Sequence, residues 1–291
     1  MFRLFLLPLV LLLIAGCDRA PSGGRQFPAK AEVATYEAKG VLREITAGGR
    51  KAVIAHEEIP GYMAAMTMEF EAKSANDLAG FKPGDVIAFR LSVTETHGWI
   101  DQVRKTGVAA LEASPVPAAG ADALPPGSPL PDCELVDQRG QPFRLSDFKG
   151  RALAFTFIFT RCPFPDFCPR MNNQLNAVQR ELGAASGATN WHLLSISLDP
   201  GYDTPERLAE YAPRYQPDAA RWTFATGKSE DILKLGLAVG LVVSREGGQI
   251  NHNLRTVVVD AAGRVQKIFA GNEWSAAELT SELKRAMAAK P

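Results

Sequence analysis

A stretch rich in alanine and proline, residues 109–131, divides the chain and most constrains how it can fold. It reads AALEASPVPAAGADALPPGSPLP and contains almost no large apolar side chains. Such a segment cannot supply a core and is typical of an extended, semi-rigid linker. We therefore predict two domains, at residues 31–108 and 127–291, joined by a linker at residues 109–126. Because 46% of its 291 residues are apolar, the chain can form a core in each domain.

The segment before the linker has the pattern of a small all-β domain. It contains short runs of apolar and β-branched residues, separated by turns that carry glycine. The clearest runs lie at residues 35–45, 51–59, 85–93 and 99–105. About five strands in this length predict a small closed or nearly closed barrel of the OB-like type.

Soft sulfur ligands are concentrated in one part of this first domain, the segment HEEIPGYMAAMTMEF at residues 56–70. Three of the six methionines of the chain, Met63, Met66 and Met68, lie there. Met66 and Met68 are two positions apart, so on a strand their thioethers would project from the same face. Thioethers select Cu(I) or Ag(I), and the imidazole of His56 could complete such a site. Methionines also fill irregular cores, and the spacing alone does not separate the two interpretations.

The segment after the linker alternates strands with helices. The run ALAFTFIFT at residues 152–160 is apolar throughout, as in a strand that is buried on both faces, and residues 192–198 and 256–260 are further strands. Helices are indicated by an apolar stripe, by a cap before proline and by a capping box. These signals are Met171, Leu175, Val178 and Leu182 for the stripe, Thr204 with Pro205 for the cap, and Ser275 with Glu278 for the box. This order predicts a thioredoxin-like α/β domain.

Two cysteines in RCPFPDFCPRMNNQL, residues 161–175, give this second domain its candidate site. Cys162 and Cys168 follow the C-terminal end of a predicted buried strand, where open α/β sheets place their sites. Cys168 precedes Pro169 at a helix start, so the positive end of the helix should favour its thiolate. Two thiolates and a nearby imidazole form a soft site that suits copper. A plain structural disulfide is the alternative, although so small a loop would add little stability.

The remaining cysteine and histidines of the two domains are assigned structural roles. Cys133 is predicted to be a small buried hydrophobic residue. His97, in a Thr-His-Gly turn, is predicted to be a solvated loop residue, and His192, at the start of a strand, is predicted to be structural.

The N-terminus has the pattern of a secretory signal. Arg3 precedes an apolar run at residues 4–14 that is too short to span a bilayer, and small residues then lead to Cys17. The stretch IAGC resembles the lipobox of bacterial lipoproteins, in which the cysteine is acylated and becomes the new N-terminus. This resemblance implies a signal peptide at residues 1–16, a lipid on Cys17, a tether at residues 17–30 and a position on the extracytoplasmic face of the bacterial cell membrane. An ordinary signal peptide with an incidental cysteine is the alternative.

The charge of the chain disfavours a nucleic-acid partner. Lys plus Arg and Asp plus Glu number 32 each, so no global positive field exists. Small barrels can bind oligonucleotides, but secretion and the lack of a basic aromatic face argue against that class here.

The first domain resembles the periplasmic copper- and silver-binding CusF family in the stretch HEEIPGYMAAMTM and in a later Gly-Asp pair before a strand. That family is a small barrel that holds Cu(I) through a histidine and two methionines. The resemblance implies that His56, Met66 and Met68 are ligands. The type member of the family caps the metal with a tryptophan three positions before the first methionine, and this chain has Met63 there. The contact between cation and ring is therefore absent, and Met63 is a candidate additional ligand.

The second domain resembles the Sco/SenC family of copper-binding, thioredoxin-like proteins, which help to assemble the copper A centre of cytochrome c oxidase. The stretches FTFIFTRCPFPDFCPRMNNQL, SISLDPGYDTPERLAEYA and NHNLRTVVVDAAGRV carry the resemblance. It implies that Cys162 and Cys168 are thiolate ligands and that His252 is the third ligand. The family usually has three residues between its cysteines, and this chain has five. This departure bears on the copper geometry and on the balance between copper delivery and redox chemistry.

Together these features predict a membrane-anchored copper metallochaperone rather than a conventional enzyme. Its metal would be Cu(I), with Cu(II) as a second candidate state. Its partners would be the copper-bearing subunit of cytochrome c oxidase or another copper protein, a thiol reductant and the membrane. The leading alternative is a thiol-disulfide oxidoreductase that uses Cys162 and Cys168 to reduce an oxidase subunit. Reductases of the thioredoxin type carry a cis-proline that faces the cysteine pair, and here no proline occurs between Pro217 and Pro291.

Overall fold

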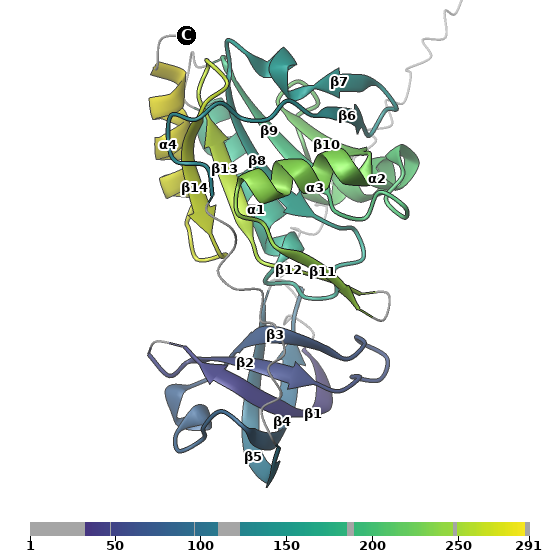
Figure 1. The fold of residues 1–291 in the computed structure, drawn as a ribbon, viewed down its shortest axis with the longest axis vertical. Helices are drawn as coiled ribbons and strands as arrows, with labels where there is room; N and C mark the ends of the chain where they lie inside the picture. The colour runs from purple at the N-terminus through teal and green to yellow at the C-terminus, as the bar shows by residue number, and fades with distance from the viewer. Residues whose placement is uncertain are drawn as a thin grey trace, which may run out of the picture. The chain divides into compact units, whose positions relative to one another are not determined.

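A computed structural model describes residues 33–46, 48–95, 97–109, 123–184, 189–246 and 249–288 (Figure 1). From Val33 onward the chain forms one compact unit. The predicted signal peptide, Cys17, the tether and most of the linker lie outside the described residues. Within the part of the chain that the structure describes, no helix is long and apolar enough to cross a membrane.

The first domain, here called the β domain, is a five-stranded antiparallel sheet (Figure 1). Its strands are β1 (Ala34–Ile45), β2 (Lys51–His56), β3 (Met66–Glu71), β4 (Asp85–Val93) and β5 (Gly98–Val108), with the short 3-10 helix η1 (Ala75–Leu78) after β3. They pair in the order β3-β2-β1-β4-β5. Beyond β3, Ala72 bridges Ile100 of β5, and the Lys73 N–H donates to the Ile100 carbonyl at 2.9 Å. The all-β prediction is confirmed, while closure into an OB-like barrel stays a prediction.

Alternating burial explains why these segments form strands. In β2, every second residue is buried, as expected of a strand with one face toward a core. The core contains Leu42, Ile54, Phe70 and Phe89, all fully buried, and the rings of Phe70 and Phe89 pack edge to face with centroids 5.4 Å apart. The packing of Phe70 on Phe89 joins β3 to β4, and backbone pairing joins β3 to β2; β2 and β3 carry His56, Met66 and Met68.

The second domain, here called the α/β domain, is built on a seven-stranded sheet in the order β14-β13-β8-β9-β10-β6-β7. Its strands are β6 (Glu134–Asp137), β7 (Pro142–Arg144), β8 (Ala152–Ile158), β9 (Trp191–Ser197), β10 (Trp222–Gly227), β13 (Arg255–Val259) and β14 (Val265–Ala270). The central strands β8, β9 and β10 are parallel, and every residue of β8 and β9 is buried. A strand that is covered on both faces is expected to be mainly apolar, as β8 is, whereas β9 also buries His192, Ser195 and Ser197.

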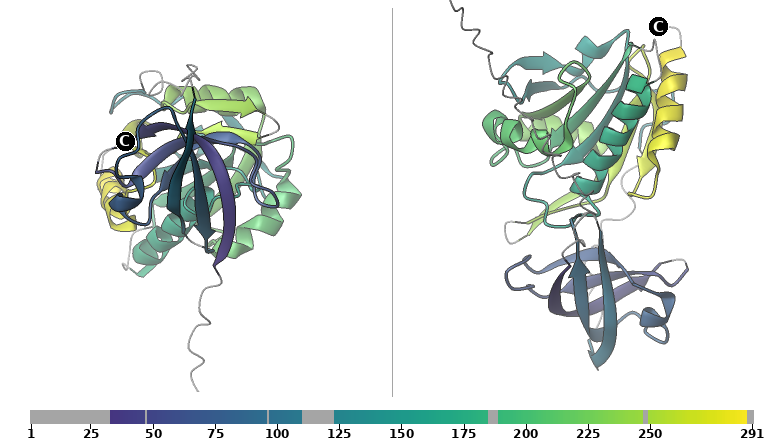
Figure 2. Two further views of the ribbon diagram at one scale, coloured as in Figure 1. Left: turned by 90° about the horizontal axis from the view of Figure 1, so that it is seen from below. Right: turned by 180° about the vertical axis from the view of Figure 1, so that it is seen from behind.

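Helices cover both faces of this sheet. α1 (Cys168–Ala184) and α4 (Ala276–Ala288) lie side by side on one face, and α3 (Ser229–Ala238) lies on the other (Figures 1 and 2). The short helices are α2 (Pro205–Tyr211), η2 (Leu145–Phe148) and η3 (Ala212–Tyr215). The predicted stripe of α1 is fully buried, Thr204 caps α2 by accepting from the Arg207 N–H, and Ser275 and Glu278 cap α4 reciprocally. These local predictions are confirmed.

Several elements have no counterpart in the sequence analysis, among them β6, β7 and β10. Another is α3, which begins after Lys228 without a side-chain cap and so gives no start signal. A further one is the hairpin of β11 (Val243–Glu246) and β12 (Gln249–His252), whose strands have four residues each. Runs this short give little periodicity to detect. The hairpin matters because it ends at His252.

Candidate metal centres

The cysteine pair lies where the sequence placed it, between the end of β8 and the start of α1. Cys162 is half-buried in the connecting loop, and Cys168 is the first residue of α1 and is fully buried. Both thiols are free, and the Cys168 side chain hydrogen bonds to the sulfur of Cys162. The pair can therefore present two sulfurs to a soft metal ion or close into a disulfide.

The acidity of the Cys168 thiol differs from the predicted one. The hydrogen bond from Cys168 lowers the pKa of Cys162, although burial opposes this effect. Burial raises the pKa of Cys168 well above its ordinary value, and interaction with Cys162 raises it further. The prediction that the helix start favours the Cys168 thiolate is therefore wrong. The cost of placing charge on a fully buried sulfur exceeds the stabilisation from the helix dipole.

Two buried aspartates, which the sequence analysis did not assign, fix the base of the cysteine loop. Asp203 is fully buried and accepts hydrogen bonds from the Thr160 N–H at 3.0 Å, from the Thr160 hydroxyl, and from the Ser197 hydroxyl at 2.5 Å. Asp199 accepts from Arg161 at 2.5 Å. Asp199 directly follows the strand segment SISL and Asp203 lies in the loop after it, so acidic residues beyond the end of a buried strand were the available signal.

The hairpin that carries His252 is anchored to the same aspartate as the loop. Arg245 of β11 lies 3.8 Å from the Asp199 carboxylate, and it donates to the Leu198 carbonyl at 2.6 Å. Asp199 thus interacts with Arg161 on the cysteine loop and with Arg245 on the hairpin. This shared anchor relates the position of His252 to that of Cys162.

The ring of His252 is in the state that binds a metal ion. Its Nδ1–H donates to the Asn253 carbonyl at 2.8 Å, which leaves the Nε2 lone pair available. Burial lowers the pKa of His252 to about 4, so the ring is neutral at pH 7. A neutral imidazole is the form that serves as a ligand.

The three predicted ligands of the α/β domain are near one another without forming a closed site. Cys162 and His252 line the same cavity of about 350 Å³, and Cys168 is buried beside Cys162. Among the described residues, no three side chains of His, Cys, Asp or Glu are close enough to hold one metal ion. His252 would therefore have to approach the pair, together with its hairpin, for all three to bind one ion.

The predicted ligands of the β domain share one face of β2 and β3. His56 pairs directly with Met66, and Ile54 pairs with Met68, so the imidazole and both thioethers project from the same side of the sheet. The Nδ1–H of His56 donates to the Glu57 carbonyl at 2.7 Å.

His56 also offers a direct test of whether this face suits a metal ion. Its Nε2 is buried and has no hydrogen-bond partner, which is costly for a polar atom. Burial also lowers the pKa of His56, which favours the neutral ring. A soft cation beside Met66 and Met68 would satisfy this nitrogen, so the donor set fits Cu(I).

Met63 differs from the other two methionines. Its backbone forms a bridge with Ile59, with hydrogen bonds of 2.8 and 3.0 Å, and its side chain is buried in the core of the β domain. Met66 and Met68 line the 350 Å³ cavity. The role of Met63 as an additional ligand stays a prediction.

Three further residues had predicted structural roles. Cys133 is buried, which raises its pKa to about 12, and His192 is buried and hydrogen bonds to the Thr223 hydroxyl at 2.9 Å. Both agree with the predictions. His97 also lies in a loop with its side chain 41% exposed, as predicted, and its Nδ1 in addition lies 2.9 Å from the carboxylate of Asp166, which stands between the two cysteines.

Comparison with known families decides the class of the protein. Residues 127–288 match the family model of SCO1/SenC. The chain belongs to the SCO1/SenC family. Residues 35–121 match the model of the copper binding periplasmic protein CusF. Both resemblances noted in the sequence are therefore confirmed.

Relatives and solved structures agree with this assignment. The SCO1 protein homolog of Bacillus subtilis is 30% identical over 141 residues, which cover 47% of this chain and 71% of the homolog. A relative in Stutzerimonas stutzeri that is named as copper-binding is 36% identical over 118 residues, 40% of this chain, and the match spans only 55% of that relative.

Among solved structures, a SCO1/SenC family lipoprotein from Bacillus anthracis has a TM-score of 0.50 at 27% identity, covering 56% of this chain and 99% of that one. BsSco, described as a Sco family member with a disulfide switch, has a TM-score of 0.50 at 27% identity, covering 58% of this chain and all of that one. The α/β domain of this SCO1/SenC protein therefore has the predicted thioredoxin-like fold, and copper is the metal that the comparisons support.

Proposed function

We propose that this SCO1/SenC protein carries copper outside the cytoplasm and delivers it to the copper A centre of cytochrome c oxidase or to another copper protein. The observation that carries the proposal is the pair of free thiols, Cys162 and Cys168, with the neutral imidazole of His252 on the same cavity. The solved relative BsSco, a member of a family named for cytochrome c oxidase assembly, supports the choice of acceptor. Copper is the cargo of such a protein.

The proposed roles of the three ligands follow from their burial. Cys168 is fully buried and would remain bound to the ion until the last step, whereas Cys162 is half-buried and is the sulfur that an acceptor can replace first. His252 stands on a hairpin and would leave or join the ion as that hairpin moves. Delivery then proceeds by exchange of one ligand at a time, and the protein needs no acid-base chemistry beyond loss of the thiol protons.

A thiol-disulfide oxidoreductase is the second candidate function. It is favoured by the asymmetric acidity of the pair, because the lowered pKa of Cys162 suits an attacking thiolate while buried Cys168 could resolve the mixed disulfide. In that case electrons, rather than copper, would pass to the acceptor.

A delivery experiment separates the two functions. We expect the reduced chain, loaded with Cu(I), to transfer its metal to a reduced copper A domain, and we expect Cys162→Ser to abolish the transfer because it removes the exposed thiolate. Cys133→Ser is the matched control, since Cys133 is a free cysteine buried elsewhere in the same domain. The measurement is copper content of the separated proteins. Reduction of a disulfide-bonded copper A domain by the metal-free chain, without copper transfer by the loaded chain, would favour the oxidoreductase.

Anchoring by a lipid on Cys17 is also part of the proposal. It is supported by the lipobox-like residues before Cys17 and by the solved lipoprotein relative. We expect Cys17→Ser to release the protein from the membrane fraction or to leave its signal uncleaved, because each buried CH₂ of an acyl chain contributes about 0.8 kcal/mol to anchoring. Fractionation and electrophoretic migration measure this effect. An unchanged distribution and migration of the variant would exclude the lipid anchor.

A further inference from the structure

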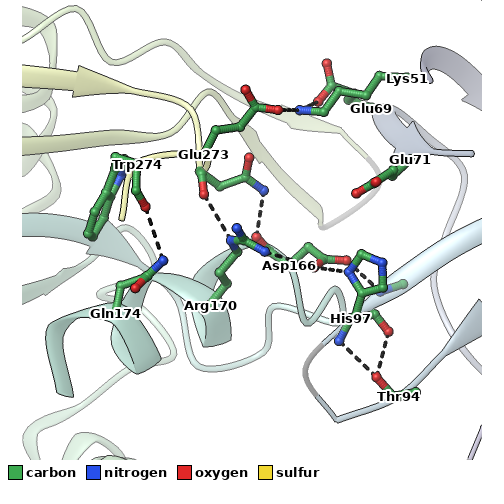
Figure 3. Close-up of polar contacts among 12 residues, drawn as sticks. Lys51, Glu69, Glu71, Thr94, His97, Asp166, Arg170, Gln174, Glu273 and Trp274 are labelled. Carbon is green, nitrogen blue, oxygen red and sulfur yellow. Dashed lines mark hydrogen bonds and ion pairs between the residues drawn. The ribbon is translucent and has the colours of Figure 1, made fainter. Parts of the chain in front are cut away.

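The loop between the two cysteines binds the β domain through a buried carboxylate. Asp166 is 7% exposed, and it accepts from the Gly98 N–H at 2.6 Å and faces His97 Nδ1 at 2.9 Å (Figure 3). Close by, Lys51 of β2 forms an ion pair of 2.6 Å with Glu273 of the α/β domain (Figure 3). Because hydrogen bonds to a buried carboxylate are strong and directional, Asp166 holds the cysteine loop at one position on the β domain.

An aromatic side chain of the same loop is part of the β-domain core. Phe164 is 3% exposed and packs edge to face on Phe70, with centroids 5.8 Å apart. Next to it, the Tyr62 hydroxyl donates to the Pro163 carbonyl at 2.8 Å. Residues between the two metal-binding cysteines therefore contact the domain that carries the methionines.

In the docked arrangement, two predicted ligands from each domain line a single cavity. Met66 and Met68 of β3 line it, and so do Cys162 and His252. Its walls are largely apolar and include Phe159, Phe164 and Ile250. A cation that leaves the thioethers would thus find a thiolate on the wall of the same cavity.

We propose that the β domain transfers Cu(I) directly to Cys162 across this cavity, and that the five-residue cysteine loop keeps the two domains docked for the transfer. The inference rests on the proposed function, in which both sites bind copper, and adds the path by which copper passes from one site to the other. In the transfer a bond between copper and a methionine thioether breaks as a bond between copper and the Cys162 sulfur forms. Copper remains monovalent, no electron moves, and the proton of the Cys162 thiol passes to water.

The direction and speed of this transfer follow from the ligands and from tethering. A thiolate is charged and binds Cu(I) more strongly than a neutral thioether, so copper moves from the β domain to the cysteine pair. Docking makes the step intramolecular, with an effective concentration in the range of mM or above. A competing chelator in solution should then intercept little of the metal.

Gly98 allows docking to be removed while every ligand is kept. A Cβ at this position would lie 3.0 Å from the Phe164 ring, so Gly98→Val should push the loop out of the β domain. Gly107→Val, on the same strand β5, is the matched control because a Cβ there meets only Val86 of the same domain, at 3.7 Å. Asp166→Asn is a second docking variant, which removes the charge but keeps the size of the side chain.

The experiment starts from the full chain with its cysteine pair oxidised and with Cu(I) loaded on the β domain. A thioredoxin-type reductant is added together with bicinchoninate, at a concentration that does not unload the oxidised chain. Copper on the thiolates is followed by its near-ultraviolet absorption, and captured copper by the colour of its bicinchoninate complex. We expect about tenfold more capture in Gly98→Val than in the natural chain or in Gly107→Val, because the effective concentration falls when docking is lost.

Equal capture by the natural chain, Gly98→Val and Asp166→Asn would overturn direct transfer. The copper content of each site, measured in the same samples, separates this result from failure of the proposed function. If the oxidised chain binds no Cu(I), or if the reduced pair takes none, the function itself is wrong. If Gly98→Val does not fold, the comparison is made between Asp166→Asn and Gly107→Val, with the same two outcomes.

Discussion

Oxidation of Cys162 and Cys168 to a disulfide should lower the copper content of the chain by about one ion, because a disulfide offers no thiolate to a soft metal. Replacing either cysteine by serine should have the same effect in the reduced protein. The measurement is metal analysis of the desalted chain, reduced and oxidised, after loading with Cu(I). His252→Ala should weaken Cu(II) binding more than Cu(I) binding, since the two remaining thiolates still suit the monovalent ion.

The control for this experiment is Cys133→Ser, which should retain both the copper content and its dependence on oxidation. Cys133 is buried near the start of β6, and its raised pKa keeps it protonated. Equal copper content in the reduced and oxidised natural chain would contradict copper carriage by the pair. The oxidoreductase would then become the better explanation of the two free thiols.

The second large effect is expected at the β domain. In a chain that lacks Cys162 and Cys168, the double change Met66→Ile and Met68→Ile should weaken Cu(I) binding by more than about 100-fold. The reason is that it deletes both thioethers, and even changes around a ligand cost 10–100-fold in metal affinity. Isoleucine keeps the apolar volume, so each change should cost less than about 1.5 kcal/mol of stability. Competition with a Cu(I) chelator measures the affinity, and denaturant unfolding measures the stability.

Met171 provides the matched control for sulfur deletion. It is a fully buried methionine of α1 in the other domain, so Met171→Ile should leave Cu(I) affinity unchanged. Cu(I) affinity that survives the double change at Met66 and Met68 would mean that these methionines only fill the core. The buried, unpaired Nε2 of His56 would then need another explanation.

Features set by neighbouring residues could be predicted from the sequence. A continuous apolar run predicted β8, and spacings of three and four predicted the buried stripe of α1. The capping box at Ser275 and Glu278 and the pair Met66 and Met68 on one face are likewise local patterns. Each depends only on residues within a few positions of one another, and each appears in the structure.

Features set by distant residues could not be predicted in the same way. His97 is 69 positions from Asp166, and its turn sequence gives no sign of that contact. The acidity of the cysteines was predicted from the helix start alone, but the burial of Cys168 depends on the whole core around it. The hairpin of β11 and β12 is short, so His252 could be placed by its resemblance to the family but not by periodicity.

The position of Phe164 limits how far this protein is modular. A linker rich in alanine and proline suggests two units that could be separated or exchanged by genetic recombination. Yet the β domain completes its core with a ring that belongs, in sequence, to the other unit. If the two domains were separated at the linker, Phe70 would lose the aromatic ring that covers it. A SCO1/SenC domain taken from another protein would need an apolar side chain at the position of Phe164 to restore this contact. Replacement of either unit is therefore expected to require a compensating change at the contact of Phe164 with Phe70.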